Sequence, residues 1–240
     1  MNPAVEAGYI QAMPSFRSAL SLPVVSVYAV ASLVLATSPA RAQGRIVDEG
    51  TFILSGAGTA GTEHFRVVSG VEPGMLRATA QLSVGDQRLA SSLTADSLGT
   101  PSLYELTTPA LHVRAHARPG RLSALSSDAQ GNESMKEYVV TPGSTVILDE
   151  RLFNQYYLVA LSRRTGTLTV ISPGTGRTTT ESLAARGMES IQVGGRAVTA
   201  AHFTLSGNGG RRDFWLDANG RVLKVQLPSG LSATREELPR

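Results

Sequence analysis

The sequence predicts a mainly β protein of the α+β class, in which a curved antiparallel sheet, or half-barrel, wraps around one main helix. Short runs of alternating apolar and polar residues recur along the chain between turn-forming residues, as is typical of antiparallel strands. A single later stretch, residues 149–164, instead places its apolar residues at helical spacing. An apolar run near the N-terminus predicts that a signal-peptide helix precedes this domain.

The first 42 residues have the layout of a cleaved leader. The apolar run 22–36 follows Arg17, and Ala40 and Ala42 then supply the A-x-A pattern that signal peptidase cuts. At 1.5 Å per residue the run reaches about 22 Å, less than the roughly 30 Å of a bilayer core, although a membrane anchor is the alternative. We expect cleavage after Ala42, with Met1 or Met13 as the start. A single β-rich domain over 43–240 would then be periplasmic or secreted, without stable membrane insertion.

The strands expected before the helix follow from alternation and turn residues. Residues 75–84 show the pattern most clearly, because Leu76, Ala78, Ala80 and Leu82 alternate with polar side chains. The full set comprises 46–55, 61–69, 75–84, 87–95, 102–107, 111–118, 121–127 and 134–141. Each neighbouring pair is separated by a short loop, which predicts a meander of hairpins.

The helical stretch 149–164 carries one apolar stripe, formed by Leu152, Phe153, Tyr156, Tyr157 and Ala160. Acids begin this stretch and arginines end it, as the helix dipole favours, and a glycine at 166 is placed to stop the helix. Strands are expected again at 167–171, 188–193, 196–205, 212–216 and 221–227. A second short helix or turn is also compatible with residues 181–186.

Asp213 and Asp217 flank the single tryptophan of the chain, Trp215, and invite a catalytic interpretation. Turn chemistry explains the same residues. Asp217-Ala218-Asn219-Gly220 lies between two alternating runs, and Asp at the first position of a turn accepts hydrogen bonds from the backbone that follows. We therefore expect a β-hairpin whose turn is capped by Asp217, and not a catalytic patch.

Composition excludes several classes of function. The chain has no cysteine, so disulfides, zinc–thiolate sites and lipid attachment at a lipobox are ruled out. The formal net charge is +3 and the arginines are scattered, whereas a nucleic-acid-binding protein concentrates basic residues on one face. We expect no nucleic-acid partner, no cofactor and no metal.

Other candidate sites are weak when their spacing is considered. His112, Arg114, His116 and Arg118 share one strand face, but the two imidazoles lie about 13 Å apart at roughly 3.3 Å per residue, too far for one metal ion. A solvated face is the simple interpretation, and an anion-binding patch is the alternative. The adjacent residues Glu63 and His64 point to opposite faces of a strand and make poor acid–base partners.

Motifs for catalysis and nucleotide binding lack their structural context. The glycines at 56, 58 and 61 match the dinucleotide-binding spacing, but no helix follows them. The serines that lie in turns lack the G-x-S-x-G pattern of a nucleophile elbow, and with four histidines in the chain no particular triad stands out. We therefore expect no catalytic residues.

Turn and strand motifs carry a family resemblance over residues 46–236. They are Gly61-Thr62-Glu63, Leu148-Asp149, Gly194-Gly195-Arg196 and the closing Phe214-Trp215-Leu216-Asp217 hairpin with Gly220-Arg221. The chain resembles secreted or periplasmic bacterial β-rich families of unknown function, related to the lipoprotein-carrier-like half-barrel. This resemblance implies a curved sheet around a helix, with an apolar cavity between them, and it carries over no catalytic residue.

The aromatic stripe of the helix is core in the simplest interpretation, and in a half-barrel it could also line a pocket. Phe153, Tyr156 and Tyr157 are then the candidate ligand-binding residues, with Trp215 as their companion from the sheet if its face points inward. Three functions remain open. They are a binding module for a lipid-like apolar or amphipathic ligand, an envelope protein-interaction module without a cavity, and a hydrolase or isomerase of unrecognised type.

Overall fold

The computed structural model describes residues 44–70, 72–162 and 165–240, and within them one large curved sheet that does not close on itself. The strands are β1 (Arg45–Ser55), β2 (Gly61–Ser69), β3 (Met75–Val84), β4 (Gln87–Asp96), β5 (Pro101–Thr107), β6 (Leu111–Arg118), β7 (Arg121–Asp128), β8 (Glu133–Val139), β9 (Thr145–Ile147), β10 (Gly166–Ser172), β11 (Arg177–Val193), β12 (Arg196–Gly207), β13 (Gly210–Leu216), β14 (Val222–Gln226) and β15 (Ser232–Arg235). One short helix, α1 (Tyr156–Leu161), completes the described part of the chain.

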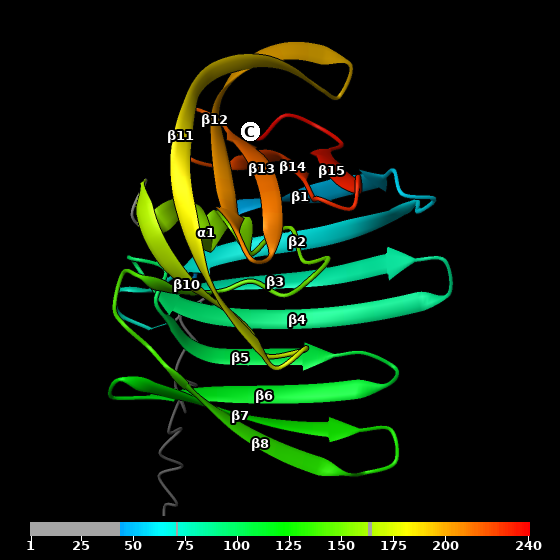
Figure 1. Cartoon of the computed structure of the whole chain (residues 1–240). Helices are drawn as coiled ribbons and strands as arrows, with labels where there is room; N and C mark the ends of the chain where they lie inside the picture. The colour runs from blue at the N-terminus through cyan, green and yellow to red at the C-terminus, as the bar shows by residue number, and fades with distance from the viewer. Residues whose placement is uncertain (1–43, 71, 163–164) are drawn as a thin grey trace, which may run out of the picture. The chain divides into compact units, whose positions relative to one another are not determined.

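The strand order is simple, because nearly every strand pairs with its neighbours in the sequence. It runs from β8 through β1 to β15 and on to β9, so the first and last strands of the domain lie side by side in the middle of the sheet. The pairs are antiparallel, except that β9 and β10 are parallel. In Figure 1, β1 to β8 form a ladder, and the long strands β11 and β12 curve at the top of the view, beyond β13 and β14.

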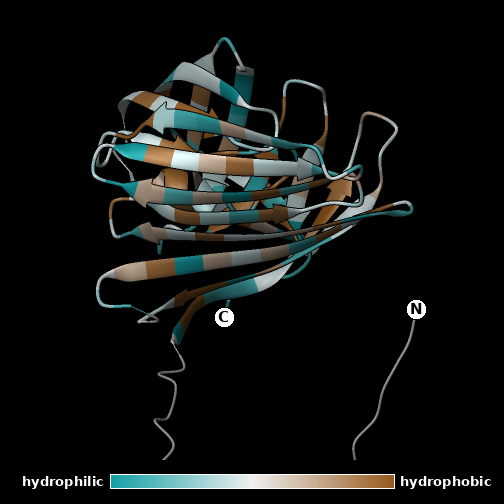
Figure 2. Ribbon diagram, turned by 90° about the horizontal axis from the view of Figure 1, so that it is seen from below, coloured by the Kyte–Doolittle hydropathy of each residue, from teal (hydrophilic) through white to brown (hydrophobic). Residues whose placement is uncertain are grey.

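Alternation along the strands decides which face is buried. On β2, Glu63, Phe65 and Val67 point into the protein, while His64 and Arg66 are exposed. This confirms that Glu63 and His64 lie on opposite faces. Figure 2 shows the same alternation of apolar and polar residues along many strands. The inward side chains form one large core, which includes the fully buried Phe52, Tyr104 and Phe214.

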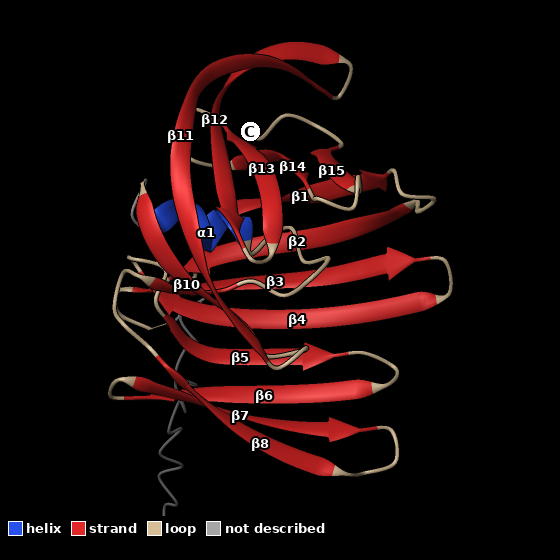
Figure 3. Ribbon diagram, in the orientation of Figure 1, coloured by secondary structure: helices blue, strands red, loops and turns tan. Residues whose placement is uncertain are grey.

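The predicted helix is much shorter than its apolar stripe suggested. Residues 149–155 form an irregular segment that is largely buried, and only Tyr156–Leu161 is helical (Figure 3). Arg151 has a φ of 71°, in the left-handed region, which an α-helix cannot contain. The hydrogen bonds that hold this segment come from distant strands and replace those of a helix. Arginines 163 and 164, expected at the helix end, lie outside the described residues.

The second half of the sheet differs from the sequence prediction in three places. Residues 181–186 are neither helix nor turn, because they belong to the long strand β11, which pairs with β10 and β12 along this stretch. The short strands β9 and β15 were not predicted at all. Each has only three or four residues, too few for a pattern of alternation to be recognised.

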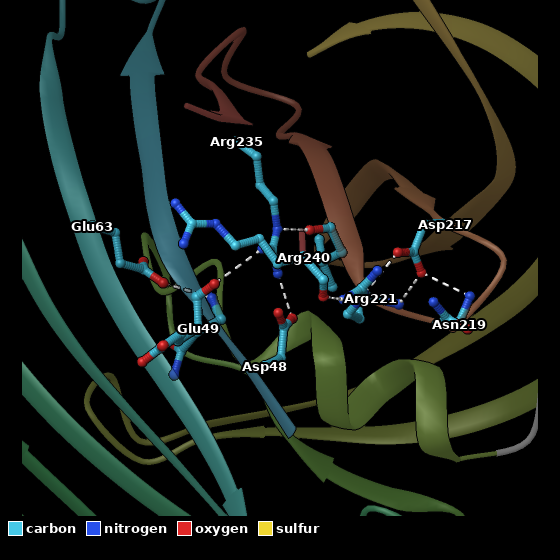
Figure 4. A network of polar contacts seen from close by, with 10 residues as sticks. Asp48, Glu49, Glu63, Asp217, Asn219, Arg221, Arg235 and Arg240 are labelled. Carbon is cyan, nitrogen blue, oxygen red and sulfur yellow. Dashed lines mark hydrogen bonds and ion pairs between the residues drawn. The ribbon is translucent and has the colours of Figure 1, made fainter. Parts of the chain in front are cut away.

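The hairpin of β13 and β14 confirms the structural interpretation of Asp217. Its carboxylate accepts hydrogen bonds from the backbone N–H groups of Asn219 (2.9 Å) and Arg221 (2.8 Å), and Gly220 has a φ of 78°. Arg221 returns a side-chain hydrogen bond to Asp217 at 2.8 Å, as Figure 4 shows. The acid therefore caps a turn.

Arg235 on β15 joins the two ends of the domain. Its guanidinium forms a buried ion pair with Asp48 on β1 and donates to the carbonyl oxygens of Val222 (2.6 Å) and Glu49 (3.2 Å) (Figure 4). The same group lies 4.8 Å from the ring centroid of Phe65. These contacts compensate the buried charge and hold β15 against β1.

The expected leader, residues 1–42, lies outside the described residues. In the ranges that the structure describes, α1 is too short to cross a membrane, and so no helix there qualifies as a membrane span.

Candidate functional site

The segment from residue 148 to 155, here termed the entry segment, is buried except at Glu150 and Arg151, although it has no regular structure. Glu63 of β2 reaches it from the sheet and accepts hydrogen bonds from the backbone N–H groups of Phe153 (2.8 Å) and Asn154 (2.6 Å). Burial raises the pKa of Glu63 to about 8, against the opposing effect of these two hydrogen bonds. Glu63 thus attaches the start of α1 to the strand ladder.

Asp149 anchors the other end of the entry segment. Its carboxylate accepts hydrogen bonds from the Tyr104 hydroxyl (2.5 Å) and from the backbone N–H of Gly174 (3.1 Å). The Asp149 N–H in turn donates to the side-chain oxygen of Gln155 at 2.6 Å. Burial raises the pKa of Asp149 to about 6, and the hydrogen bond from Tyr104 counteracts part of that rise.

A cavity of about 460 Å³ opens beside the entry segment, and we refer to it as the entry cavity. This volume lies within the usual range of small-molecule sites, about 300–1,000 Å³. Its walls come from five parts of the chain. They are the β1–β2 turn (Ala57, Thr59), the entry segment with Tyr156, the β10–β11 hairpin (Ser172, Arg177, Thr179), the β12–β13 turn with Arg212 and the β14–β15 turn (Leu227, Pro228, Ser229, Leu231).

One wall of the entry cavity carries a buried ion pair. Arg212 of β13 lies 2.5 Å from the carboxylate of Glu181 on β11, and their side chains are 13% and 0% exposed. The same carboxylate oxygen accepts a hydrogen bond from Thr179 at 2.8 Å. Burial raises the pKa of Tyr156, and the neighbouring Arg212 guanidinium opposes that rise. The cavity wall therefore combines apolar and aromatic surface with three arginines, of which Arg212 is paired with a buried carboxylate.

The structure separates the four residues expected to bind a ligand. Phe153 and Tyr156 both line the entry cavity. Tyr156 packs against Phe214, with ring centroids 5.5 Å apart. Tyr157 is buried in the core and is not part of the cavity wall. Burial, together with the nearby charge of Asp48, raises the pKa of the Tyr157 hydroxyl. Trp215 lies in a different cluster.

Trp215 does not face the helix, so its expected place beside the helix aromatics was wrong. Neighbouring residues of a strand point to opposite faces, and it is Phe214 that points toward α1. Trp215 stacks on His202, with ring centroids 4.6 Å apart, and donates a hydrogen bond to Glu189 at 2.9 Å. Lys224 lies 4.9 Å from its ring centroid. This arrangement belongs to a small separate cluster of buried residues on the other face of β13.

The histidine face of β6 is solvated in the structure. His112, Arg114, His116 and Arg118 are all exposed, and Arg114 pairs with Glu105 at 3.0 Å. Within the described ranges, no group of three or more His, Asp or Glu side chains has an arrangement suited to a metal ion.

Sequence reasoning missed the charged residues of the entry cavity, although strand parity carried a signal. Arg212 lies two residues before the buried Phe214 on β13, and Glu181 lies two residues before the buried Leu183 on β11. Residues two apart in a strand point to the same face. A charged residue in register with buried apolar neighbours is expected to point inward and to need a partner. The missing information was that these two strands lie on either side of β12 and bring the residues together.

Comparisons with known proteins agree with this fold. The family model of a domain of unknown function, DUF6134, matches residues 112–238. The crystal structure of a β-barrel-like protein of domain of unknown function DUF1849 from Brucella abortus superposes with a TM-score of 0.52 at 10% sequence identity. That likeness covers 80% of this chain and 97% of the other, and it concerns the fold alone. Among curated proteins, none matches the chain.

Proposed function

We propose that this chain, which belongs to the DUF6134 family, is a non-catalytic binding module for an apolar or amphipathic ligand. The residues that the family model matches include every part of the entry cavity wall except Ala57 and Thr59. The observation that carries the proposal is the entry cavity itself. Aromatic and apolar side chains line it together with polar and charged groups that can orient a ligand. We further propose that the protein works in the periplasm or outside the cell, on the basis of the leader pattern in residues 1–42.

The entry cavity is suited to binding more than to catalysis. Its polar groups are engaged with each other, since Asp149 is held by Tyr104 and Gly174, and Arg212 by Glu181. A general base needs a free lone pair directed at a substrate, and a nucleophile needs a base beside it. Such engaged groups instead provide fixed hydrogen-bonding positions on an apolar wall.

The proposal is tested by filling the entry cavity. Ser229 is exposed on the β14–β15 turn and lines the cavity, so the substitution Ser229→Trp places an indole in it. Ser97→Trp is the matched control, because Ser97 is exposed in another turn and does not line the entry cavity. Binding of the uncharged fluorescent probe N-phenyl-1-naphthylamine would be measured for the full-length chain, and co-purified lipid would be sought by native mass spectrometry.

We expect probe binding to fall about tenfold or more in Ser229→Trp and to stay unchanged in Ser97→Trp, since tenfold corresponds to about 1.4 kcal/mol of lost contacts. Equal binding by both variants, or empty spectra together with no probe binding by the unmodified protein, would exclude the entry cavity as a binding site.

A second candidate function rests on the edge strand β8. Its outer side chains Met135 and Val139 are 73% and 68% exposed, and apolar residues at a free sheet edge are a common place for strand addition by a partner. In this case the protein is an envelope interaction module. Recovery of one stoichiometric partner from envelope extract, lost when Met135 is changed to Lys, would favour this function over the first.

A further inference from the structure

Arg212 is the charged group of the entry cavity wall that is best placed to recognise a ligand head. A guanidinium carries five N–H donors, of which Glu181 engages one nitrogen at 2.5 Å. The Arg212 side chain remains 13% exposed and lines the entry cavity. It therefore offers hydrogen-bond donors, and a ligand must supply the acceptor.

The charge of Arg212 is already compensated. The Glu181 carboxylate beside it is fully buried, and its second oxygen has no hydrogen-bond partner among the described residues. An anionic head bound to Arg212 would come close to this carboxylate, and repulsion between like charges is strong where water is excluded. A carbonyl oxygen can accept the same hydrogen bonds without adding a charge.

The other charges around the entry cavity also balance. Arg177 pairs with Glu150 at the exposed rim, with 3.8 Å between their charged atoms. Asp149 and Arg151 complete the charged lining, so that the three arginines of the wall are equal in number to three acids, Asp149, Glu150 and the adjacent Glu181. The site therefore has no net excess of either sign to attract an ion.

The turn between β12 and β13 keeps the ion pair close to the entry cavity. A Cβ atom added at Gly209 would come within 2.6 Å of a Glu181 carboxylate oxygen and would collide with Arg212. Gly209 itself lines the cavity. Because Gly209 has no side chain, the backbone of the turn can pack directly against the Arg212–Glu181 ion pair.

From these observations we propose that the entry cavity binds an uncharged amphiphile whose head carries a carbonyl group, such as a long-chain amide or a monoacylglycerol. The carbonyl oxygen accepts from Arg212, and the chain lies along the accessible apolar side chains of the wall, which include Leu227 and Pro228. The inference rests on the proposed binding function and adds the class of ligand to it.

The test compares heads on one alkyl chain. Lauramide, laurate and dodecylammonium would compete with N-phenyl-1-naphthylamine for the full-length protein at pH 8. We expect lauramide to displace the probe at a concentration about tenfold or more below that of either ion. Glu181→Gln leaves Arg212 uncompensated and should raise the affinity for laurate relative to lauramide by about tenfold, as expected for an ion pair sheltered from water.

Glu137→Gln is the matched control, because it removes the same charge from a side chain that is 47% exposed and does not line the entry cavity. Its effect on the ratio of laurate to lauramide affinity should be small, about twofold, as is usual for exposed ion pairs. If Glu181→Gln does not fold, the double variant Glu181→Gln with Arg212→Gln replaces the ion pair by two neutral amides. It should still bind lauramide more tightly than laurate.

The outcomes separate the two proposals. If laurate binds the unmodified protein as tightly as lauramide, the neutral-head inference is wrong while the binding function stands. Failure of all three amphiphiles and of the probe to bind would overturn the binding function and this inference with it.

Discussion

Glu63 makes the stability of this protein depend on pH in a direction unusual for a carboxyl group. It is fully buried, and its pKa is raised from an ordinary 4.5 to about 8. The folded state therefore holds the proton more tightly than the unfolded state does. The corresponding stabilisation is complete below pH 4.5 and is lost as the pH rises through about 8. At 1.36 kcal/mol per pKa unit, the loss amounts to about 4–5 kcal/mol.

The substitution Glu63→Gln removes this titration. Glutamine keeps one acceptor oxygen, but its amide nitrogen faces one of the two backbone N–H groups that the carboxylate now accepts. Leaving that donor unpaired costs about 1–3 kcal/mol. We therefore expect the variant to be less stable than the unmodified protein at pH 5, and more stable by about 2 kcal/mol at pH 9.

Urea denaturation followed by circular dichroism between pH 5 and pH 9 measures this difference. Other titrating groups, including Asp149, contribute equally to both proteins and cancel when the two free energies of unfolding are subtracted. Glu105→Gln is the control, because the Glu105 side chain is 40% exposed. A constant difference between Glu63→Gln and the unmodified protein across this pH range would refute the reasoning, since it would mean that Glu63 does not titrate within it.

Three further predictions concern other parts of the molecule. Arg235→Met should destabilise the protein by about 3–5 kcal/mol in urea denaturation, because Asp48 is left buried and unpaired. Adding Asp48→Asn to the same chain should recover much of that loss, and no recovery would contradict the pairing. Gly99→Ala should lower the melting temperature more than Gly120→Ala. Both glycines have φ above 70°, worth about 1–2 kcal/mol, but only at Gly99 would the new Cβ press on a backbone carbonyl of α1. Trp215→Phe should leave probe binding unchanged and cost about 1 kcal/mol of stability through its lost hydrogen bond, whereas reduced probe binding would place Trp215 in the site after all.

Much of the sheet could be predicted because its signals are local. Alternation and turn residues predicted β1 to β8 within a few residues of their observed bounds, and they identified Asp217 as the cap of a turn. The outward position of His64 followed from the same two-residue period. Each of these features depends on residues that are neighbours in the chain.

The parts that failed depend on residues far apart in the chain. The entry segment has the spacing of a helix. However, Glu63, which lies 90 residues before Phe153, accepts a hydrogen bond from the Phe153 N–H, and Tyr104, 45 residues before Asp149, donates a hydrogen bond to Asp149. Residues 181–186 are compatible with a helix in isolation, but 181–183 pair with both β10 and β12, and 184 and 185 pair with β12, which makes the stretch part of a strand. Local propensity is weak compared with such pairing.

The candidate site shows the same division. The pattern of residues was enough to expect a curved β domain with Phe153 and Tyr156 against the sheet, because an apolar stripe has to be buried somewhere. It was not enough to choose between Phe214 and Trp215, two aromatic neighbours on opposite faces of one strand. The folded arrangement decided that choice, because which face of β13 points toward α1 depends on the elements that pack against the strand. It also brought Arg212 and Glu181 together beside the β12–β13 turn.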